Sequence, residues 1–109
     1  MIEFVSIVLT LMSSTHSMPI YFDDEQKEIG REVVQEAHKL GEDPYTLMAI
    51  AWQETRIRRG QTSHTGDVGI FQINWRFWGK KIWQYKSYRQ FVEDMDNVEH
   101  GPLAAVMVL

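Results

Sequence analysis

A helix end and a helix start follow each other directly at residues 41–44 of this chain. Gly41 is typical of the left-handed residue that closes a helix. Asp43 is a good N-cap, and Pro44 suits the first position of a helix, where its missing N–H costs nothing. The sequence therefore predicts two consecutive helices joined by a short turn, the first beginning near Asp23 or Asp24.

Apolar residues recur at helical spacing in both segments. In the first they are Ile29, Val33, Ala37 and Leu40, and in the second Leu47, Ile50 and Ala51, with Glu54 on the same face. Three arginines then follow at 56–59 and oppose the negative end of the helix dipole. Gly60 is predicted to stop the second helix.

The remainder of the chain predicts shorter elements. Residues 61–69 are rich in turn formers, and 68–73 fit a short strand or hairpin. Residues 75–88 are aromatic and basic without a clean period, which predicts a loop with one short helical turn. A third helix over 91–98 is expected to stop at Gly101-Pro102, and the apolar run 103–109 reads as a buried helix. The expected fold class is mostly α with a small β-hairpin.

Composition limits the chemistry of the chain. Its 109 residues suffice for one small domain, and the absence of Cys excludes disulfides, cysteine catalysis and Cys-type zinc sites. The four His share no metal-ligand spacing, so neither a metal nor a cofactor is expected. The net charge is -4, yet residues 56–89 carry eight basic side chains against Asp67 alone. This segment implies an anionic partner: an acidic glycan, nucleic acid, or the acidic remainder of the chain.

Residues 1–22 form an apolar N-terminal segment. Phe4 to Met12 is apolar apart from Ser6 and Thr10, and it is too short to span a bilayer as a helix. Its length suits the core of an export signal, although the usual positive start is replaced by Glu3. Export signal and buried first element are both left open, and no transmembrane segment is predicted.

Glu54 is the residue that most directly indicates a chemistry. Glycosidic bonds are cleaved by a carboxylic acid that still holds its proton near neutral pH. Burial on the apolar helix face would disfavour the carboxylate and so keep Glu54 protonated. The alternative is an ordinary ion pair of Glu54 with Arg58, four residues further along the helix.

Two runs carry a resemblance to a known family: Ala51-Trp52-Gln53-Glu54-Thr55 and Ser63-His64-Thr65-Gly66-Asp67-Val68-Gly69-Ile70-Phe71-Gln72-Ile73-Asn74. They resemble the lysozyme-like lytic transglycosylases of the SLT type, over about residues 40–101. The run from Gly69 to Asn74, with the aromatic residues 75–78, is also similar to c-type lysozyme. The resemblance implies an α+β lysozyme-like domain over 23–109, with several helices around a catalytic Glu.

The resemblance also implies a role for each matched residue. Glu54 would act first as general acid and then as general base. Residues that would contact the sugar chain are Ser63, Gly69, Gln72, Asn74, Trp75 and Trp78. Asp67 stands where c-type lysozyme has its second carboxylate, so it is a candidate catalytic residue. A transglycosylase does not need that group, and the alternative for Asp67 is a turn held by hydrogen bonds.

Two departures from the family pattern stand out. The usual Glu-Ser pair is Glu54-Thr55, which keeps a hydroxyl. The family also continues beyond a glycine such as Gly101 to a Tyr-containing motif that lines the cleft, whereas this chain ends at Leu109. The domain is therefore expected to be incomplete at its C-terminus. Truncation, completion by another chain, and loss of catalysis are the open explanations.

The resemblance thus implies a peptidoglycan-cleaving enzyme, most specifically a lytic transglycosylase acting between N-acetylmuramic acid and N-acetylglucosamine. The expected setting is local wall opening during phage entry or assembly of a secretion machine, in the periplasm or on a virion. Expected partners are glycan strands and other subunits of such a particle or machine. Aromatic and basic residues 75–89 would also suit single-stranded nucleic acid, but the acidic remainder of the chain opposes it. The alternative function is a degenerate structural or glycan-binding domain.

Overall fold

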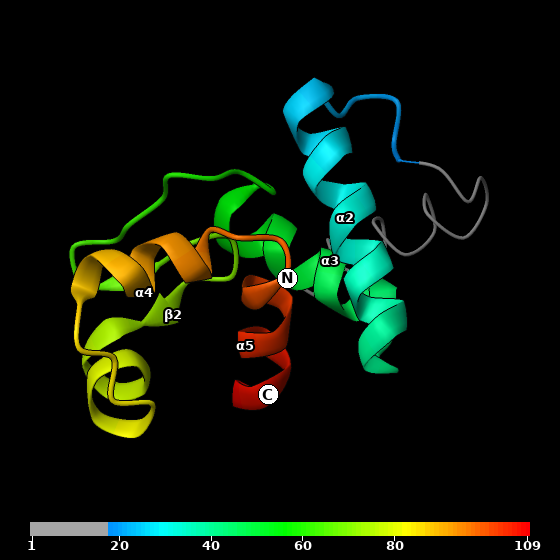
Figure 1. Ribbon diagram of the computed structural model, residues 1–109. Helices are drawn as coiled ribbons and strands as arrows, with labels where there is room; N and C mark the ends of the chain where they lie inside the picture. The colour runs from blue at the N-terminus through cyan, green and yellow to red at the C-terminus, as the bar shows by residue number, and fades with distance from the viewer. Residues whose placement is uncertain (1–17) are drawn as a thin grey trace.

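The computed structural model describes residues 18–109, so the apolar run from Phe4 to Met12 lies outside the described part. The elements in chain order are α2 (Asp24–Leu40), α3 (Pro44–Thr55), β1 (Asp67–Val68), β2 (Ile73–Asn74), η1 (Trp75–Ile82), α4 (Tyr88–Met95) and α5 (His100–Val108) (Figure 1). The predicted mostly helical α+β class with one small hairpin is confirmed. Within residues 18–109 no helix is both long and apolar enough to cross a membrane.

The two long helices begin where the sequence predicts. Asp23 and Gln26 form a reciprocal capping box at the start of α2, and Gly41 closes that helix with a φ of 70°. Asp43 caps α3 by accepting a hydrogen bond from the Tyr45 amide. Gln26 is itself buried, and its side-chain nitrogen donates a 2.9 Å hydrogen bond to the carbonyl of Arg56. The start of α2 is thereby joined to the residues that follow α3.

The predicted end of the second helix at Gly60 is wrong, because α3 ends at Thr55. Arg56 and Ile57 both have a φ of 58°, which turns the backbone away from the helix axis. This turn places the Ile57 side chain fully inside the core. Burial of an isoleucine contributes about 1.5–3 kcal/mol, which offsets much of the roughly 2–4 kcal/mol that two left-handed residues cost.

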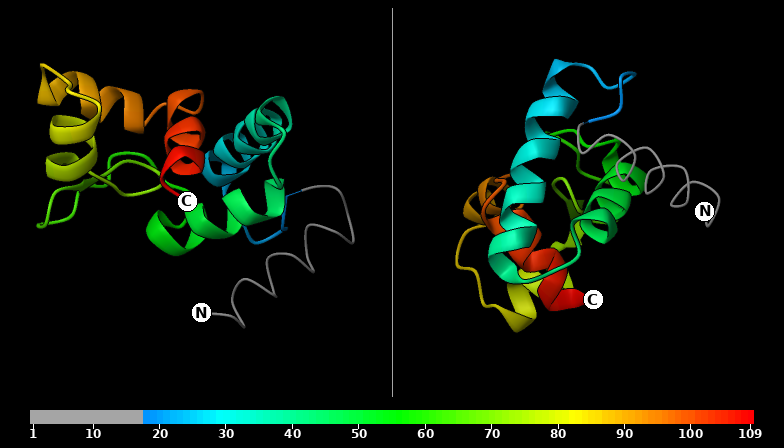
Figure 2. Two further views of the ribbon diagram at one scale, coloured as in Figure 1. Left: turned by 90° about the horizontal axis from the view of Figure 1, so that it is seen from below. Right: turned by 90° about the vertical axis from the view of Figure 1, so that its right-hand side faces the viewer.

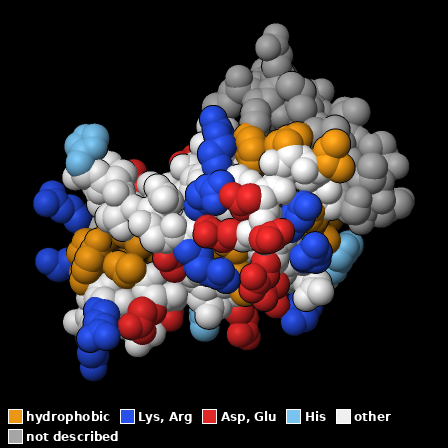
Figure 3. Space-filling view, turned by 90° about the horizontal axis from the view of Figure 1, so that it is seen from above, with side chains coloured by type: hydrophobic (Ala, Val, Ile, Leu, Met, Phe, Trp, Pro, Cys, Tyr) orange, Lys and Arg blue, Asp and Glu red, His pale blue; other side chains and the backbone are white. Residues whose placement is uncertain are grey.

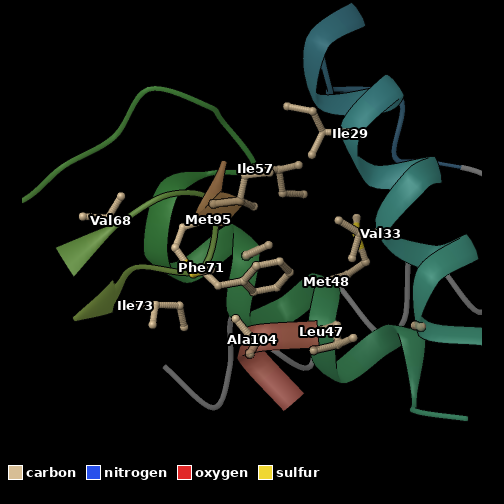
Figure 4. Packing of buried hydrophobic residues seen from close by; sticks show 14 of the residues in the cluster. Ile29, Val33, Leu47, Met48, Ile57, Val68, Phe71, Ile73, Met95 and Ala104 are labelled. Atoms are coloured by element: carbon tan, nitrogen blue, oxygen red, sulfur yellow. The ribbon is translucent and has the colours of Figure 1, made fainter. Parts of the chain in front are cut away.

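The core lies where the hairpin meets the helices. α2 packs along α3, and α5 lies between α2 and α4 (Figures 1 and 2). Phe71 of the hairpin turn points toward the helices, between Ile57 and Ala104 (Figure 4). The other large buried side chains around it are Ile29, Val33, Leu47, Met48, Val68, Ile70, Ile73, Phe91 and Met95.

The hairpin is short and tightly packed. β1 and β2 are antiparallel, with Asp67 opposite Asn74 and Val68 opposite Ile73. Gly69 follows β1 with a φ of 82°, and a β-carbon there would collide with the carbonyl oxygen of Met95. Glycine at 69 is therefore required by packing against the end of α4.

The loop predicted over 75–88 is also wrong in its first half, which forms the π-helix η1. Asn74 caps this helix by accepting a 2.9 Å hydrogen bond from the Phe77 amide, and the Trp83 amide donates to the Trp78 carbonyl at 2.8 Å. Gly79 allows the helix to lie against aromatic rings, because a β-carbon there would be 2.6 Å from the Trp75 ring and 2.7 Å from that of Phe91. The contact with Phe91 joins η1 to α4, so no local sequence pattern predicts it.

The C-terminal helices differ from prediction in their boundaries. α4 ends at Met95, and Gly101 and Pro102 lie in the first turn of α5 instead of stopping a helix. The Asn97 side chain accepts hydrogen bonds from the amides of Glu99 and His100, at 2.7 and 3.2 Å, and so defines the new start. α5 buries Ala104 and Ala105, but Leu103 and Met107 are 40% and 58% exposed. The expectation of a buried helix is therefore only half right.

Candidate active site

Glu54 lies in the last turn of α3, beside the hairpin turn. The side chain as a whole is exposed, so the predicted burial on the apolar face is wrong, although Leu47 and Ala51 of that face are buried. Partial desolvation of the carboxyl group nevertheless raises its pKa, and the negative charge of Asp67 raises it further. The arrangement favours a protonated carboxylic acid at a solvent-accessible position, as a general acid requires.

The predicted alternative partner of Glu54 is engaged elsewhere. The Arg58 guanidinium lies 2.6 Å from the Asp23 carboxylate and 4.0 Å from that of Glu25. These pairs connect the residues after α3 to the start of α2. Arg58 therefore does not neutralise the candidate acid.

Thr55 is a positioning residue that the sequence analysis did not select. Its side chain is 8% exposed, and its hydroxyl lies 2.8 Å from the Ile70 carbonyl oxygen and 3.2 Å from that of Ala51. The same hydroxyl accepts a hydrogen bond from the Arg58 amide. The residue next to the acid thus ties the end of α3 to the hairpin turn. A hydroxyl directly after the Glu was the available signal.

Asp67 is held by three side chains. Its carboxylate accepts hydrogen bonds from the Thr65 hydroxyl at 3.1 Å, the Ser63 hydroxyl at 3.3 Å and the Asn74 amide at 3.0 Å. The Ser63 hydroxyl also accepts a 3.0 Å hydrogen bond from the backbone of Asp67. The carboxylate therefore stabilises the turn, as one of its two predicted roles requires, while its charge acts on Glu54.

Asn74 and Ser63, both predicted to contact sugar, are bonded within the protein. The Asn74 amide nitrogen donates to Asp67 and to the Thr65 carbonyl, while its oxygen accepts from the Phe77 amide. Ser63 shares its hydroxyl with Thr65 and Asp67. A sugar hydroxyl would have to compete with these hydrogen bonds. In this structure both side chains stabilise the turn and the start of η1.

Gln72 and Gly69 belong to the hairpin turn between β1 and β2. Gln72 has a φ of 54°, and its side-chain nitrogen donates to the carbonyls of Gln61 and Gly69, at 3.1 and 3.0 Å. Within residues 18–109 the side-chain oxygen of Gln72 accepts no hydrogen bond, which leaves it able to bind a ligand. A β-carbon at Gly69 would collide with the Met95 backbone, so packing requires a glycine there. Its predicted contact with the sugar chain stays a prediction.

The two predicted tryptophans occupy different places. Trp75 is half-buried, packs edge-on against Tyr88 at 5.2 Å between ring centroids, and lines a groove beside the turn. Trp78 packs against Phe77 at 4.9 Å and Trp83 at 5.6 Å, away from that groove. Trp75 is therefore brought to the turn that carries Asp67, and Trp78 is not.

The described part of the chain contains no evident metal-binding site. Among residues 18–109, no group of three or more His, Asp or Glu side chains is placed to hold an ion. What the site offers is a carboxyl group with a raised pKa, a hydrogen-bonded carboxylate beside it, and amide and hydroxyl groups on one turn. Such a set suits proton transfer to and from an oxygen.

Comparison with known proteins places this arrangement in a family. Residues 32–109 match the family model described as the transglycosylase SLT domain. Neither a curated protein nor a solved structure matches the chain significantly. The matched segment begins within α2 and includes Glu54, the hairpin, η1, α4 and α5. Because it spans well over half of the chain, the chain belongs to the transglycosylase SLT domain family, whose domains are peptidoglycan-cleaving lytic transglycosylases.

Proposed function

We propose that the chain cleaves the bond between N-acetylmuramic acid and N-acetylglucosamine, with Glu54 as the only catalytic carboxyl group. Protonated Glu54 would donate its proton to the glycosidic oxygen as the bond to the muramic acid C1 breaks. The resulting carboxylate would then remove the proton from the 6-hydroxyl of the same sugar, whose oxygen closes a ring on C1. The acid ends in its starting protonation state, and no water is consumed.

The observation that carries this proposal is the raised pKa of Glu54 next to a charged Asp67. A general acid must be protonated before it can act, and both desolvation and the neighbouring charge favour that form. The groups that produce the shift lie inside the segment that matches the family.

Asp67 supports ring closure over hydrolysis. In a retaining hydrolase the second carboxylate attacks C1. Both oxygens of Asp67 accept hydrogen bonds from the protein, one from Asn74 and the other from Ser63 and Thr65, which holds the carboxylate in the turn. Its role in the proposal is to hold the turn and to keep the proton on Glu54.

The biological setting belongs to the same proposal. A small wall-cutting domain suits local opening of the peptidoglycan layer, as in phage entry or assembly of a secretion machine. It would act outside the cytoplasm, in the periplasm or as part of a virion, and with other subunits of the particle or machine.

Mass spectrometry of digested sacculi tests the reaction. The expected product carries a 1,6-anhydro ring and is lighter by one water than the hydrolytic product. Glu54→Gln should abolish release of muropeptides and keep the circular dichroism spectrum. Full activity in this variant would refute the assignment, and a hydrated product would change it to a hydrolase.

A second candidate function is a glycan-binding domain without catalysis. The exposure of Glu54 is the observation that favours it, because a solvated acid is less strongly pushed toward the protonated form. Binding to sacculi without any release of muropeptides by the wild-type chain would favour this candidate.

A further inference from the structure

A groove lies beside residues 62–66, the turn that leads into β1, on the side of η1 and α4. The turn contributes hydroxyl groups from residues 62–65, η1 contributes Trp75 and Arg76, and α4 contributes Tyr88. Trp75 and Tyr88 meet edge-on, and Tyr88 is 45% exposed, so the groove has an aromatic wall. Aromatic rings and hydroxyl groups together suit a ligand with both apolar and polar parts.

The groove has one charged side chain among the described residues, Arg76. No Asp or Glu of that part of the chain lines it. Figure 3 shows Lys, Arg and His side chains projecting from the η1 and α4 side, at the left, while most of the visible Asp and Glu side chains lie over the centre. Among residues 18–109, Arg76 forms no ion pair, whereas three other arginines each lie near a carboxylate: Arg58, Arg59 and Arg89. An unpaired guanidinium at the edge of a groove is suited to a carboxylate, which it can bind through two parallel hydrogen bonds.

The turn at residues 62–66 connects the groove to the candidate acid. The hydroxyls of Ser63 and Thr65 line the groove and donate to the carboxylate of Asp67. The charge of that same carboxylate raises the pKa of Glu54. A ligand that passes over this turn can therefore have one part at Glu54 and another in the groove.

We propose that the groove binds the acidic peptide stem carried by the muramic acid residues of the glycan, with Arg76 pairing with a stem carboxylate. This inference rests on the proposed function, because the stem is part of the peptidoglycan strand that the chain is proposed to cleave. A stem fits better than a nucleic acid strand. One guanidinium among the residues that line the groove suits an isolated carboxylate, whereas a phosphate chain would need a row of cations along it.

The test compares glycan strands that carry stems with the same strands after an amidase has removed them. Arg76→Gln should raise the KM for stem-bearing strands about fivefold, as expected for loss of one exposed charged pair, and leave the KM for bare strands unchanged. Arg31→Gln is the matched control, since Arg31 is also exposed but lies on α2, and it should change neither KM. An equal effect of Arg76→Gln on both substrates, or no effect on either, would overturn the proposal.

A binding measurement separates this inference from the proposed function. Titration of Glu54→Gln protein with a synthetic acidic stem tetrapeptide should give binding that weakens in the added Arg76→Gln background and at higher salt. If the wild-type chain cuts no glycan but this binding is observed, the proposed function fails and the groove assignment stands. If the chain cuts both substrates equally and the peptide does not bind, the groove assignment fails alone. Tighter, Arg76-dependent binding of a short single-stranded oligonucleotide would also overturn it.

Discussion

The hydroxyl of Thr55 lies 2.8 Å from the carbonyl oxygen of Ile70, so the residue next to the candidate acid is fastened to the hairpin turn. This bond lies in the buried interior and joins two segments that are separate in sequence. The position of Glu54 relative to Asp67 therefore depends on a hydroxyl group that takes no part in proton transfer.

Replacement of Thr55 tests this dependence. Thr55→Val keeps the shape but leaves the carbonyl of Ile70 without its partner, which should lower the free energy of unfolding by about 1–3 kcal/mol. Thr55→Ser keeps the hydroxyl and should lose less than half of that. Urea unfolding gives the two values, and muropeptide release from sacculi should fall in the valine variant. Equal stability of the two variants would contradict a role for the hydrogen bond.

Gly69→Ala should destabilise the fold far more than Gly41→Ala. Both glycines have a positive φ, so each substitution costs about 1–2 kcal/mol of backbone strain. At Gly41 the added methyl group meets open space, whereas at Gly69 it collides with the Met95 backbone, adding about 1–3 kcal/mol. Thermal and urea unfolding of the pair would measure the difference. Similar losses would show that α4 can move away from the turn.

The pH dependence of activity should respond to Asp67. A general acid is lost as the pH rises through its pKa, and the charge of Asp67 raises the pKa of Glu54. Asp67→Asn removes that charge, so the alkaline limb of the kcat/KM profile should move to lower pH. Desolvation, the larger cause of the shift, remains, so the limb should stay above the range of an ordinary glutamate. A profile that does not move would contradict the coupling.

Stability should also change with pH at Glu54. The folded-state pKa of this group is raised, so its contribution is fully present below the unfolded-state pKa and is lost as the pH rises through the folded-state value. Glutamine does not titrate, so Glu54→Gln removes this pH-dependent contribution to stability. The variant should therefore gain stability relative to the wild type as the pH rises from acid to neutral. Glu28→Gln, on the exposed surface of α2, serves as the control for removal of one charge.

Much of the helical frame could be predicted because its signals are local. The capping residues Asp23, Gly41, Asp43 and Pro44 act on backbone within a few positions, so they can be read from the chain. The end of α3 could not, because it depends on burying Ile57 against residues far along the sequence. The π-helix η1 likewise depends on Gly79 lying against Trp75 and Phe91.

The residues of the candidate site could be predicted from the sequence, but their hydrogen-bond partners and their exposure to solvent could not. The predicted transglycosylase family is confirmed by the match over residues 32–109, whereas the likeness to c-type lysozyme stays a prediction. Glu54, Asp67 and Asn74 were found through short motifs. Their environment was not, since the exposure of Glu54 and the bonds around Asp67 result from how the hairpin packs. The roles of the predicted sugar-contacting residues also stay predictions.

The start of α2 is linked twice to the backbone that leaves α3, through Asp23 to Arg58 and through Gln26 to the carbonyl of Arg56. Fraying of the first turn of α2 would release both links at once and free the end of the helix that carries Glu54. Helix termini usually open first and exchange their amide hydrogens fastest. We therefore expect the first turn of α2 and the last turn of α3 to open together, so that slow amide exchange in the one would report an intact acid site in the other.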